Sequence, residues 1–220
     1  MCPKTYVPWV ILVIKALEKY KSIVQNFSYL YGAVLIQNLV SLVLTFYLVR
    51  ALSETQYAEY SLILAYINIF ASFSLTGLGE AVMQSTARKK IGIYLNAQKA
   101  MLLASTISAI IFIALAYFHK LSNDHSEALY LSMAAAAILF PFYKGLTIWK
   151  NFKNGKQEFK QLSIINVSSS VITNFLIIYL LIIDISESYI PLIIIYLLIP
   201  SLINVYMFFN DYFHHNIKNN

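Results

Sequence analysis

The stretch that decides the fold lies near the N-terminus and reads SIVQNFSYLYGAVLIQNLVSLVLTFYLV, from Ser22 to Val49. Its 28 residues include no Asp, Glu, Lys or Arg. The hydrocarbon core of a bilayer is about 30 Å thick, and an α-helix that rises about 1.5 Å per residue crosses it in about 20 residues. This stretch is therefore long enough and apolar enough to form a transmembrane helix.

Five more stretches without a charged residue follow it. They are Tyr60–Gly79, Ala100–His119, Ala128–Tyr143, Gln161–Ile183 and Ser188–Asn210. Hydrophobic residues make up 59% of the chain and charged residues 12%, whereas soluble domains have about 45–50% and about 25%. We therefore predict an all-α polytopic membrane protein with six transmembrane helices. The predicted spans are Phe27–Val49, Tyr60–Gly79, Ala100–Phe118, Leu129–Ile148, Leu162–Ile183 and Tyr189–Phe209.

The fourth of these stretches is short for a span. Its helix reaches the required length if Lys144 extends its ammonium to the headgroups and the helix continues to about Trp149. Lys144 would then be the only basic residue set deep enough to face a cavity. Pro141 and Pro200 fall inside predicted spans, where proline favours a kink.

Basic residues indicate the orientation of the six helices. Fourteen Lys and Arg precede the first span, follow the sixth or lie in the second and fourth connections, whereas the other connections hold only Arg50 and Lys120. Cytoplasmic loops carry the excess of Lys and Arg, so both termini are predicted to be cytoplasmic. We expect residues 1–25 to form an amphipathic helix at the cytoplasmic surface, 26–210 the six-helix transmembrane lobe and 211–220 a cytoplasmic tail.

Amide and hydroxyl side chains form stripes within four of the spans, because residues at i, i+3 and i+4 share one face of a helix. The stripes include Gln37, Ser41 and Thr45 with Asn38 beside them, then Asn68 and Ser72, then Asn166, Ser170, Thr173 and Asn174, and finally Ser201 and Asn204. Such residues either hydrogen-bond between helices or line a water-filled cavity. Four striped helices in one chain favour a cavity.

Catalytic and metal-binding patterns are missing from the sequence. It has no nucleophile elbow, zinc-protease motif or phosphate-binding glycine loop, and no carboxylate lies at the middle of a span. Cys2 has no partner for a disulfide, and no third ligand accompanies His214 and His215. We therefore predict no enzymatic activity, no metal, no cofactor and no nucleic-acid partner. The net charge of +6 is explained by the membrane topology.

Residues 29–92 read YLYGAVLIQNLVSLVLTFYLVRALSETQYAEYSLILAYINIFASFSLTGLGEAVMQSTARKKIG. This segment resembles the N-terminal region of the O-antigen and polysaccharide-repeat flippases of the MATE-like multidrug/oligosaccharidyl-lipid/polysaccharide exporter superfamily. The matching elements are Tyr31, Gly32, Gln37 and Asn38, then 48–52, Tyr57, Tyr60, Gly77-Leu78 and Ala87-Arg88, and, later, 145–152. The chain departs from the family at Ser53 and Ala58, where glycine is common.

The resemblance implies a translocase of lipopolysaccharide-type precursors: an undecaprenyl-pyrophosphate-linked oligosaccharide would cross the bacterial cytoplasmic membrane through a polar cavity between two six-helix lobes. The chain would be one such lobe, with a second copy or a separately encoded lobe as partner. The expected cavity residues are Gln37, Asn38, Asn68, Ser72, Asn166, Asn174, Lys144 and Arg88. Lys144, and after it Arg88, would hold the pyrophosphate; the competing interpretation is that both only anchor helices at the headgroups.

Two other functions remain open at this point. The chain would be a membrane glycosyl polymerase or acyltransferase of the same kind of gene cluster if an outer loop supplied catalytic groups, and its predicted outer loops are short. Alternatively, it would be a truncated, non-transporting remnant of a larger transporter.

Overall fold

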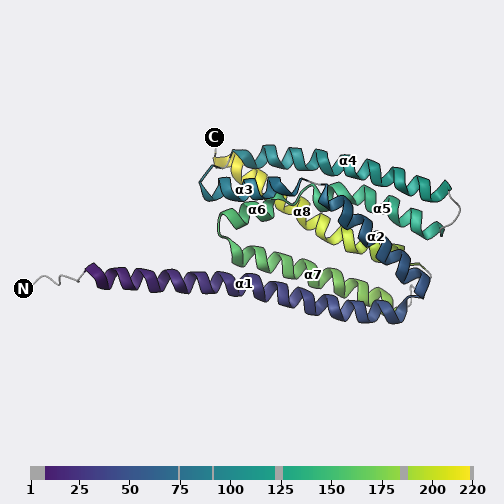
Figure 1. Cartoon of the computed structure of the whole chain (residues 1–220), viewed down its shortest axis with the longest axis horizontal. Coiled ribbons are helices and arrows are strands. Elements are labelled where there is room, and N and C mark those ends of the chain that lie inside the picture. The colour runs from purple at the N-terminus through teal and green to yellow at the C-terminus, as the bar shows by residue number, and fades with distance from the viewer. Residues whose placement is uncertain (1–7, 74, 91, 122–125, 184–187, 219–220) are drawn as a thin grey trace, which may run out of the picture.

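The computed structural model describes residues 8–73, 75–90, 92–121, 126–183 and 188–218, and side chains mainly between Tyr20 and Phe213. Every regular element in these ranges is a helix. The helices are α1 (Pro8–Ala51), α2 (Glu54–Ser72), α3 (Thr76–Ala87), α4 (Ile93–Leu121), α5 (Glu127–Lys144), α6 (Ile148–Gly155), α7 (Phe159–Ile182) and α8 (Ile190–Lys218) (Figure 1).

The long helices have the length and hydropathy of membrane spans. Five spans pass this test, namely Val24–Ala51, Ile93–Leu121, Glu127–Gly155, Phe159–Ile182 and Ile190–Asp211. A sixth crossing results if α2 and α3 form one bent span. The structure therefore confirms the predicted fold class, an all-α polytopic membrane protein.

The second span differs from its prediction as a single straight helix over Tyr60–Gly79. Helix α2 ends at Ser72, and α3 follows at an angle of 53°. The break contains Leu75, whose backbone is left-handed with φ of 48°, a conformation that ends a helix. The Ser72 hydroxyl also donates to the Asn68 carbonyl at 3.2 Å, a contact that often bends helices. At its other end α2 begins with a capping box, in which Ser53 and Gln56 bond each other's backbone N–H.

The fourth span, Glu127–Gly155, reaches past Trp149 as predicted, but its helix is interrupted. Helix α5 ends at Lys144, and the short helix α6 begins only at Ile148. Gly145 is pressed against the Pro141 carbonyl and the Ser105 hydroxyl, so that a Cβ has no room there. Helix α5 therefore meets α4 closely at this point, and the interruption lies within the single span Glu127–Gly155.

Four carbonyl groups at this break receive side-chain donors. The Asn204 amide donates to the carbonyls of Phe142 at 3.3 Å and Tyr143 at 2.9 Å. The Thr147 hydroxyl donates to the Lys144 carbonyl at 2.8 Å, and the buried Gln98 amide donates to the Gly145 carbonyl. A break in a membrane helix is tolerated where neighbours satisfy the backbone, and here α4, α6 and α8 surround it.

The helices form two groups that meet along α7 and α8. Helix α1 lies along α7 at one edge, while α4, α5 and α8 pack beside one another, with α2 across them (Figure 1). Ile63, Phe112, Phe140 and Ile193 are fully buried between α2, α4, α5 and α8. Helices α3 and α6 pack together at the end of the bundle opposite the turn between α1 and α2 (Figure 1).

Helix α1 extends well beyond the bundle on its N-terminal side (Figure 1). It runs unbroken from Pro8 to Ala51, through the predicted boundary between the surface segment 1–25 and the first span. Helix α8 likewise continues through the predicted tail, 211–220, as far as Lys218. Cys2, His125 and the side chains of residues 1–19, His214 and His215 lie outside the part that the structure describes, so the interfacial position of residues 1–25 stays a prediction.

Candidate substrate groove and lysine chamber

A groove of about 390 Å³ lies within the bundle, where α1 and α7 face α5, α6 and α8. We term it the polar groove. Its lining residues are Gln37, Ser41, Tyr143, Lys150, Asn166, Ser169, Ser170, Thr173, Asn174, Tyr196 and Pro200. Its walls therefore offer neutral amides and hydroxyls and one ammonium group, within helices that are otherwise apolar.

Some of these polar groups are already used inside the protein. The Thr173 hydroxyl donates to the Ser169 carbonyl at 2.8 Å, and the Asn174 amide donates to the Ser170 hydroxyl at 3.2 Å. The amides of Gln37 and Asn166, by contrast, form no hydrogen bond with any residue that the structure describes. An amide without a partner is unfavourable in an apolar environment, so these two call for water or a polar ligand in the groove.

Aromatic rings and a proline shape the side of the groove formed by α5 and α8. The rings of Tyr143 and Tyr196 are tilted against each other with 6.2 Å between centroids. Pro200 has no N–H to donate, which leaves the carbonyl of Tyr196 without its usual helical donor. This wall thus combines flat apolar surface with polar atoms.

Three of the residues predicted from the sequence lie together in the polar groove: Gln37, Asn166 and Asn174. Asn38 does not, because consecutive helical residues point about 100° apart. It lines a wider, largely apolar depression of about 660 Å³ on α1, together with residues such as Phe27 and Leu39.

The predicted residues of the second span lie elsewhere. Asn68 and Ser72 are exposed on α2, and Arg88 is exposed at the end of α3. None of these three lines the polar groove or the neighbouring cavity that contains Lys144.

Lys144 lies in a second cavity, of about 350 Å³, beside the break between α5 and α6. We term this cavity the lysine chamber. Its polar lining consists of Lys144, Thr147, Lys150 and Asn151, and its remaining wall comes from Ala71, Gly79 and Met101. Within the part of the chain that the structure describes, neither ammonium has a carboxylate within 4 Å.

Lys150 lines both cavities, which corrects the expectation that Lys144 alone is deep enough to face one. The expectation failed because it continued the α5 helix to Trp149. Lys150 instead lies after the break, in α6, whose fully buried Trp149 donates its indole N–H to the Asn204 amide oxygen at 3.0 Å. Pro141 and Gly145, four residues apart near the end of a short span, were the available sequence signal for this turn.

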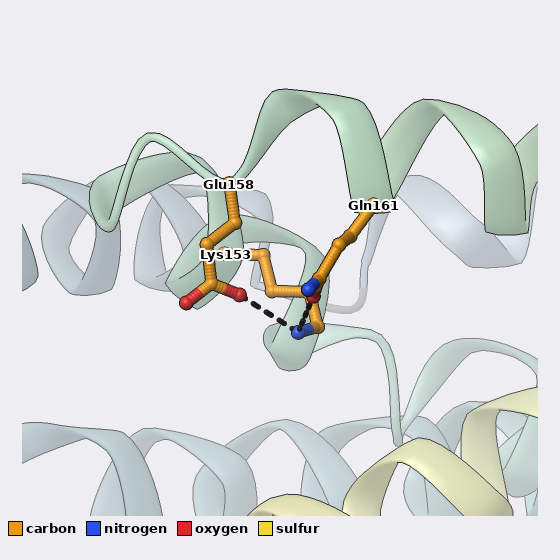
Figure 2. Close-up of polar contacts among 3 residues, drawn as sticks. All are labelled: Lys153, Glu158 and Gln161. Carbon is orange, nitrogen blue, oxygen red and sulfur yellow. Dashed lines mark hydrogen bonds and ion pairs between the residues drawn. The ribbon is translucent and has the colours of Figure 1, made fainter.

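A third lysine of this region is held entirely by the protein. The Lys153 ammonium, at the end of α6, donates to the Glu158 carboxylate at 2.9 Å and to the Gln161 amide oxygen at 3.1 Å (Figure 2). Its side chain is only 9% exposed. The three side chains converge across the turn from α6 to α7 and fix it (Figure 2).

This arrangement, a bundle of membrane helices around a polar groove, defines a polytopic membrane protein with an internal polar surface. The polysaccharide biosynthesis protein family matches residues 23–219, which is nearly the whole chain. The chain belongs to this family. No curated protein and no solved structure matches it significantly.

Proposed function

We propose that this chain takes part in moving an undecaprenyl-pyrophosphate-linked oligosaccharide from the inner to the outer leaflet of the bacterial cytoplasmic membrane. Family membership supports a role in polysaccharide biosynthesis, and the fold supports a role within the membrane. In this proposal the protein is a carrier rather than an enzyme. The sugar, the part of the cargo that apolar lipid excludes most strongly, passes through the polar groove.

The observation that carries the proposal is the pair of unpartnered amides in the groove. Gln37 and Asn166, on α1 and α7, face a cavity that already holds the hydroxyls of Ser41 and Ser170. Sugars present many hydroxyl groups, each both donor and acceptor, and neutral amides match them without binding them tightly. A transport pathway needs such modest affinity, since the cargo must leave again.

The proposed carrier includes a second lobe, either another copy of this chain or a separately encoded protein. Asn38, Asn68 and Ser72 are exposed within or beside the spans, where contact with lipid is unfavourable for polar side chains. A partner that covers these positions would satisfy them. It would also close the second side of a pathway too wide for one bundle of helices.

A transport assay with adjacent variants tests the function. Gln37→Leu should lower the flipping of a lipid-linked oligosaccharide at least fivefold in cells that supply the partner lobe, because it removes a groove amide. Asn38→Leu, one residue away but outside the groove, should leave flipping within twofold of wild type when both variants accumulate normally. Equal transport by both variants, or equal losses, would exclude the polar groove as the pathway.

Orientation is tested by cysteine labelling in a Cys2→Ser background. Cysteines at the exposed positions Thr55, Lys90 and Lys156 sample opposite ends of the bundle. With both termini cytoplasmic, as the basic residues predict, an impermeant reagent outside the cell should label position 55 and spare positions 90 and 156. The reverse pattern would invert the proposed topology. Position 123, a further predicted outer site, lies outside the described residues.

A further inference from the structure

The lysine chamber holds two cations that no described residue of the protein neutralises. Lys144 ends α5, and Lys150 lies in the first turn of α6. Their described contacts are with neighbouring aromatic rings: the Lys144 ammonium lies 4.8 Å from the centroid of Tyr143, and that of Lys150 lies 5.6 Å from the centroid of Trp149. Among the described residues, neither lysine forms an ion pair.

Two ammonium groups in one cavity of a membrane bundle repel each other, and both lose hydration there. Ionisable residues inside a span cost free energy, and they usually pair with another group and mark a functional site. Aromatic faces attract cations only weakly, by about 0.5–2 kcal/mol, and do not cancel charge. An anion is therefore the ligand that this cavity suits, and two adjacent cations suit a doubly charged one.

We propose that the lysine chamber binds the phosphate or diphosphate group of a membrane lipid, held by Lys144 and Lys150. The other polar lining groups fit this ligand. The Asn151 amide adds N–H donors, and Thr147 lies at the same wall. A volume of about 350 Å³ exceeds the ~30 Å³ share of one water many times, so a diphosphate has room.

The position of Lys150 connects this anion site to the polar groove, because Lys150 lines both. A diphosphate in the chamber therefore places whatever is attached to it next to the part of the groove that Lys150 and Tyr143 line. This inference rests on the proposed function in one respect: the lipid-linked oligosaccharide is the diphosphate whose sugar would occupy the groove. The anion site itself is independent of whether the chain transports anything.

A binding measurement on the full chain tests the site. The protein is placed in nanodiscs of zwitterionic phosphatidylcholine and titrated with inorganic pyrophosphate. The double variant Lys144→Gln/Lys150→Gln should raise the Kd at least tenfold, since each lysine near a membrane surface contributes roughly fivefold toward an anion. The control, Lys156→Gln/Lys160→Gln, removes the same charge from exposed positions and should change the Kd less than twofold. Equal Kd values for the two double variants would overturn the proposal.

A second measurement needs no variant and identifies the source of the phosphate. Amine acylation of the wild-type protein is read by mass spectrometry at Lys144 and Lys150, with exposed Lys160 as the internal reference. Protection by undecaprenyl pyrophosphate but not by phosphatidylglycerol would assign the site to the lipid-linked substrate. Protection by both would assign it to membrane phospholipid headgroups as well. Protection by neither would overturn the proposal.

The outcomes also separate this inference from the proposed function. A protein that flips its cargo while Lys144 and Lys150 bind no phosphate would refute the anion site alone. A protein whose lysines bind undecaprenyl pyrophosphate, but which moves no lipid-linked sugar with any partner lobe, would refute the proposed function alone.

Discussion

Lys153 lies within ten residues of Lys144 and Lys150, but the source of the negative charge that neutralises the ammonium group differs between them. Lys153 is nearly buried, yet the Glu158 carboxylate and the Gln161 amide oxygen lie 2.9 and 3.1 Å from its ammonium. Lys144 and Lys150 share a cavity and contact only aromatic rings among the described residues. Burial alone therefore does not distinguish a structural lysine from a binding one, whereas the presence of an internal partner does.

The difference follows from the elements that carry the side chains. Lys153 and Glu158 flank the turn from α6 to α7, so local geometry brings them together in every copy of the fold. Lys144 and Lys150 flank the break between α5 and α6, where neighbouring helices supply amides to the backbone and, among the described residues, no carboxylate to the ammonium groups. The first pair stabilises a turn, and the second keeps its charge available for a ligand.

The largest expected change in the free energy of unfolding follows from removing the carboxylate partner of Lys153. Glu158→Leu leaves the Lys153 ammonium buried with one neutral acceptor, and we expect a loss of about 2–3 kcal/mol in the free energy of unfolding. This is less than the about 3–5 kcal/mol of a fully buried pair, because the Glu158 side chain is 35% exposed. Denaturation of the wild-type and Glu158→Leu proteins in mixed micelles measures this loss in the free energy of unfolding. The double change Lys153→Met/Glu158→Leu should recover most of the loss, and a double variant as unstable as the single one would refute the explanation.

A somewhat smaller loss is expected at Asn204, which holds the break beside the unpaired lysines. Asn204→Leu removes the hydrogen bond from Trp149 and orphans the carbonyls of Phe142 and Tyr143. At about 0.6–1 kcal/mol for each of three hydrogen bonds within a membrane protein, the expected destabilisation is about 2 kcal/mol. The same variant should weaken pyrophosphate binding, because α6 positions Lys150. Adding Leu202→Asn to the Asn204→Leu variant returns an amide to α8, but on an exposed face. It is therefore not expected to restore either the stability or the pyrophosphate binding.

The smallest expected change in the free energy of unfolding distinguishes Lys144 and Lys150, which have no ion-pair partner among the described residues, from the paired Lys153 most directly. Lys144→Met and Lys150→Met should change the free energy of unfolding by less than about 1 kcal/mol, with stabilisation favoured, since each removes an uncompensated charge from a cavity. Lys153→Met should destabilise instead, because it leaves the Glu158 carboxylate without its partner. Thermal unfolding in the absence of phosphate ligands checks this. A large loss of stability at Lys150 would show that the fold, rather than a ligand, depends on its charge.

Most of the spans could be predicted from the sequence, because all but the fourth of the runs without charge are as long as the bilayer core is thick. The two errors in the predicted backbone fall at Phe73–Leu75 and Gly145–Thr147, where a helix ends within an apolar stretch. Hydropathy does not register such breaks. They depend on tertiary contacts, such as the Gln98 amide that meets the Gly145 carbonyl from another helix.

The structure brings only some of the predicted site residues together, for a related reason. Helical periodicity places Gln37 on a polar face of α1, and Asn166 and Asn174 on a polar face of α7. These two faces meet in the structure. Periodicity cannot say which neighbour a face meets, so Asn38 was grouped with Gln37 although it points to a different surface. Lys150 was missed because its direction depends on the turn after Lys144.

The hydrogen bonds from the Asn204 amide to the break between α5 and α6 also have a consequence for the order of biogenesis. The donor to the carbonyls of Phe142 and Tyr143 is Asn204 in α8, a helix that leaves the ribosome after α5 and α6. Until α8 enters the membrane, these carbonyls can be satisfied only by the N–H groups four residues further on, as in an ordinary helix. The nascent protein is therefore expected to insert Glu127–Gly155 as one continuous helix and to interrupt it after Lys144 only on assembly with α8. Crosslinking between positions 142 and 204 on stalled chains of increasing length would follow that step.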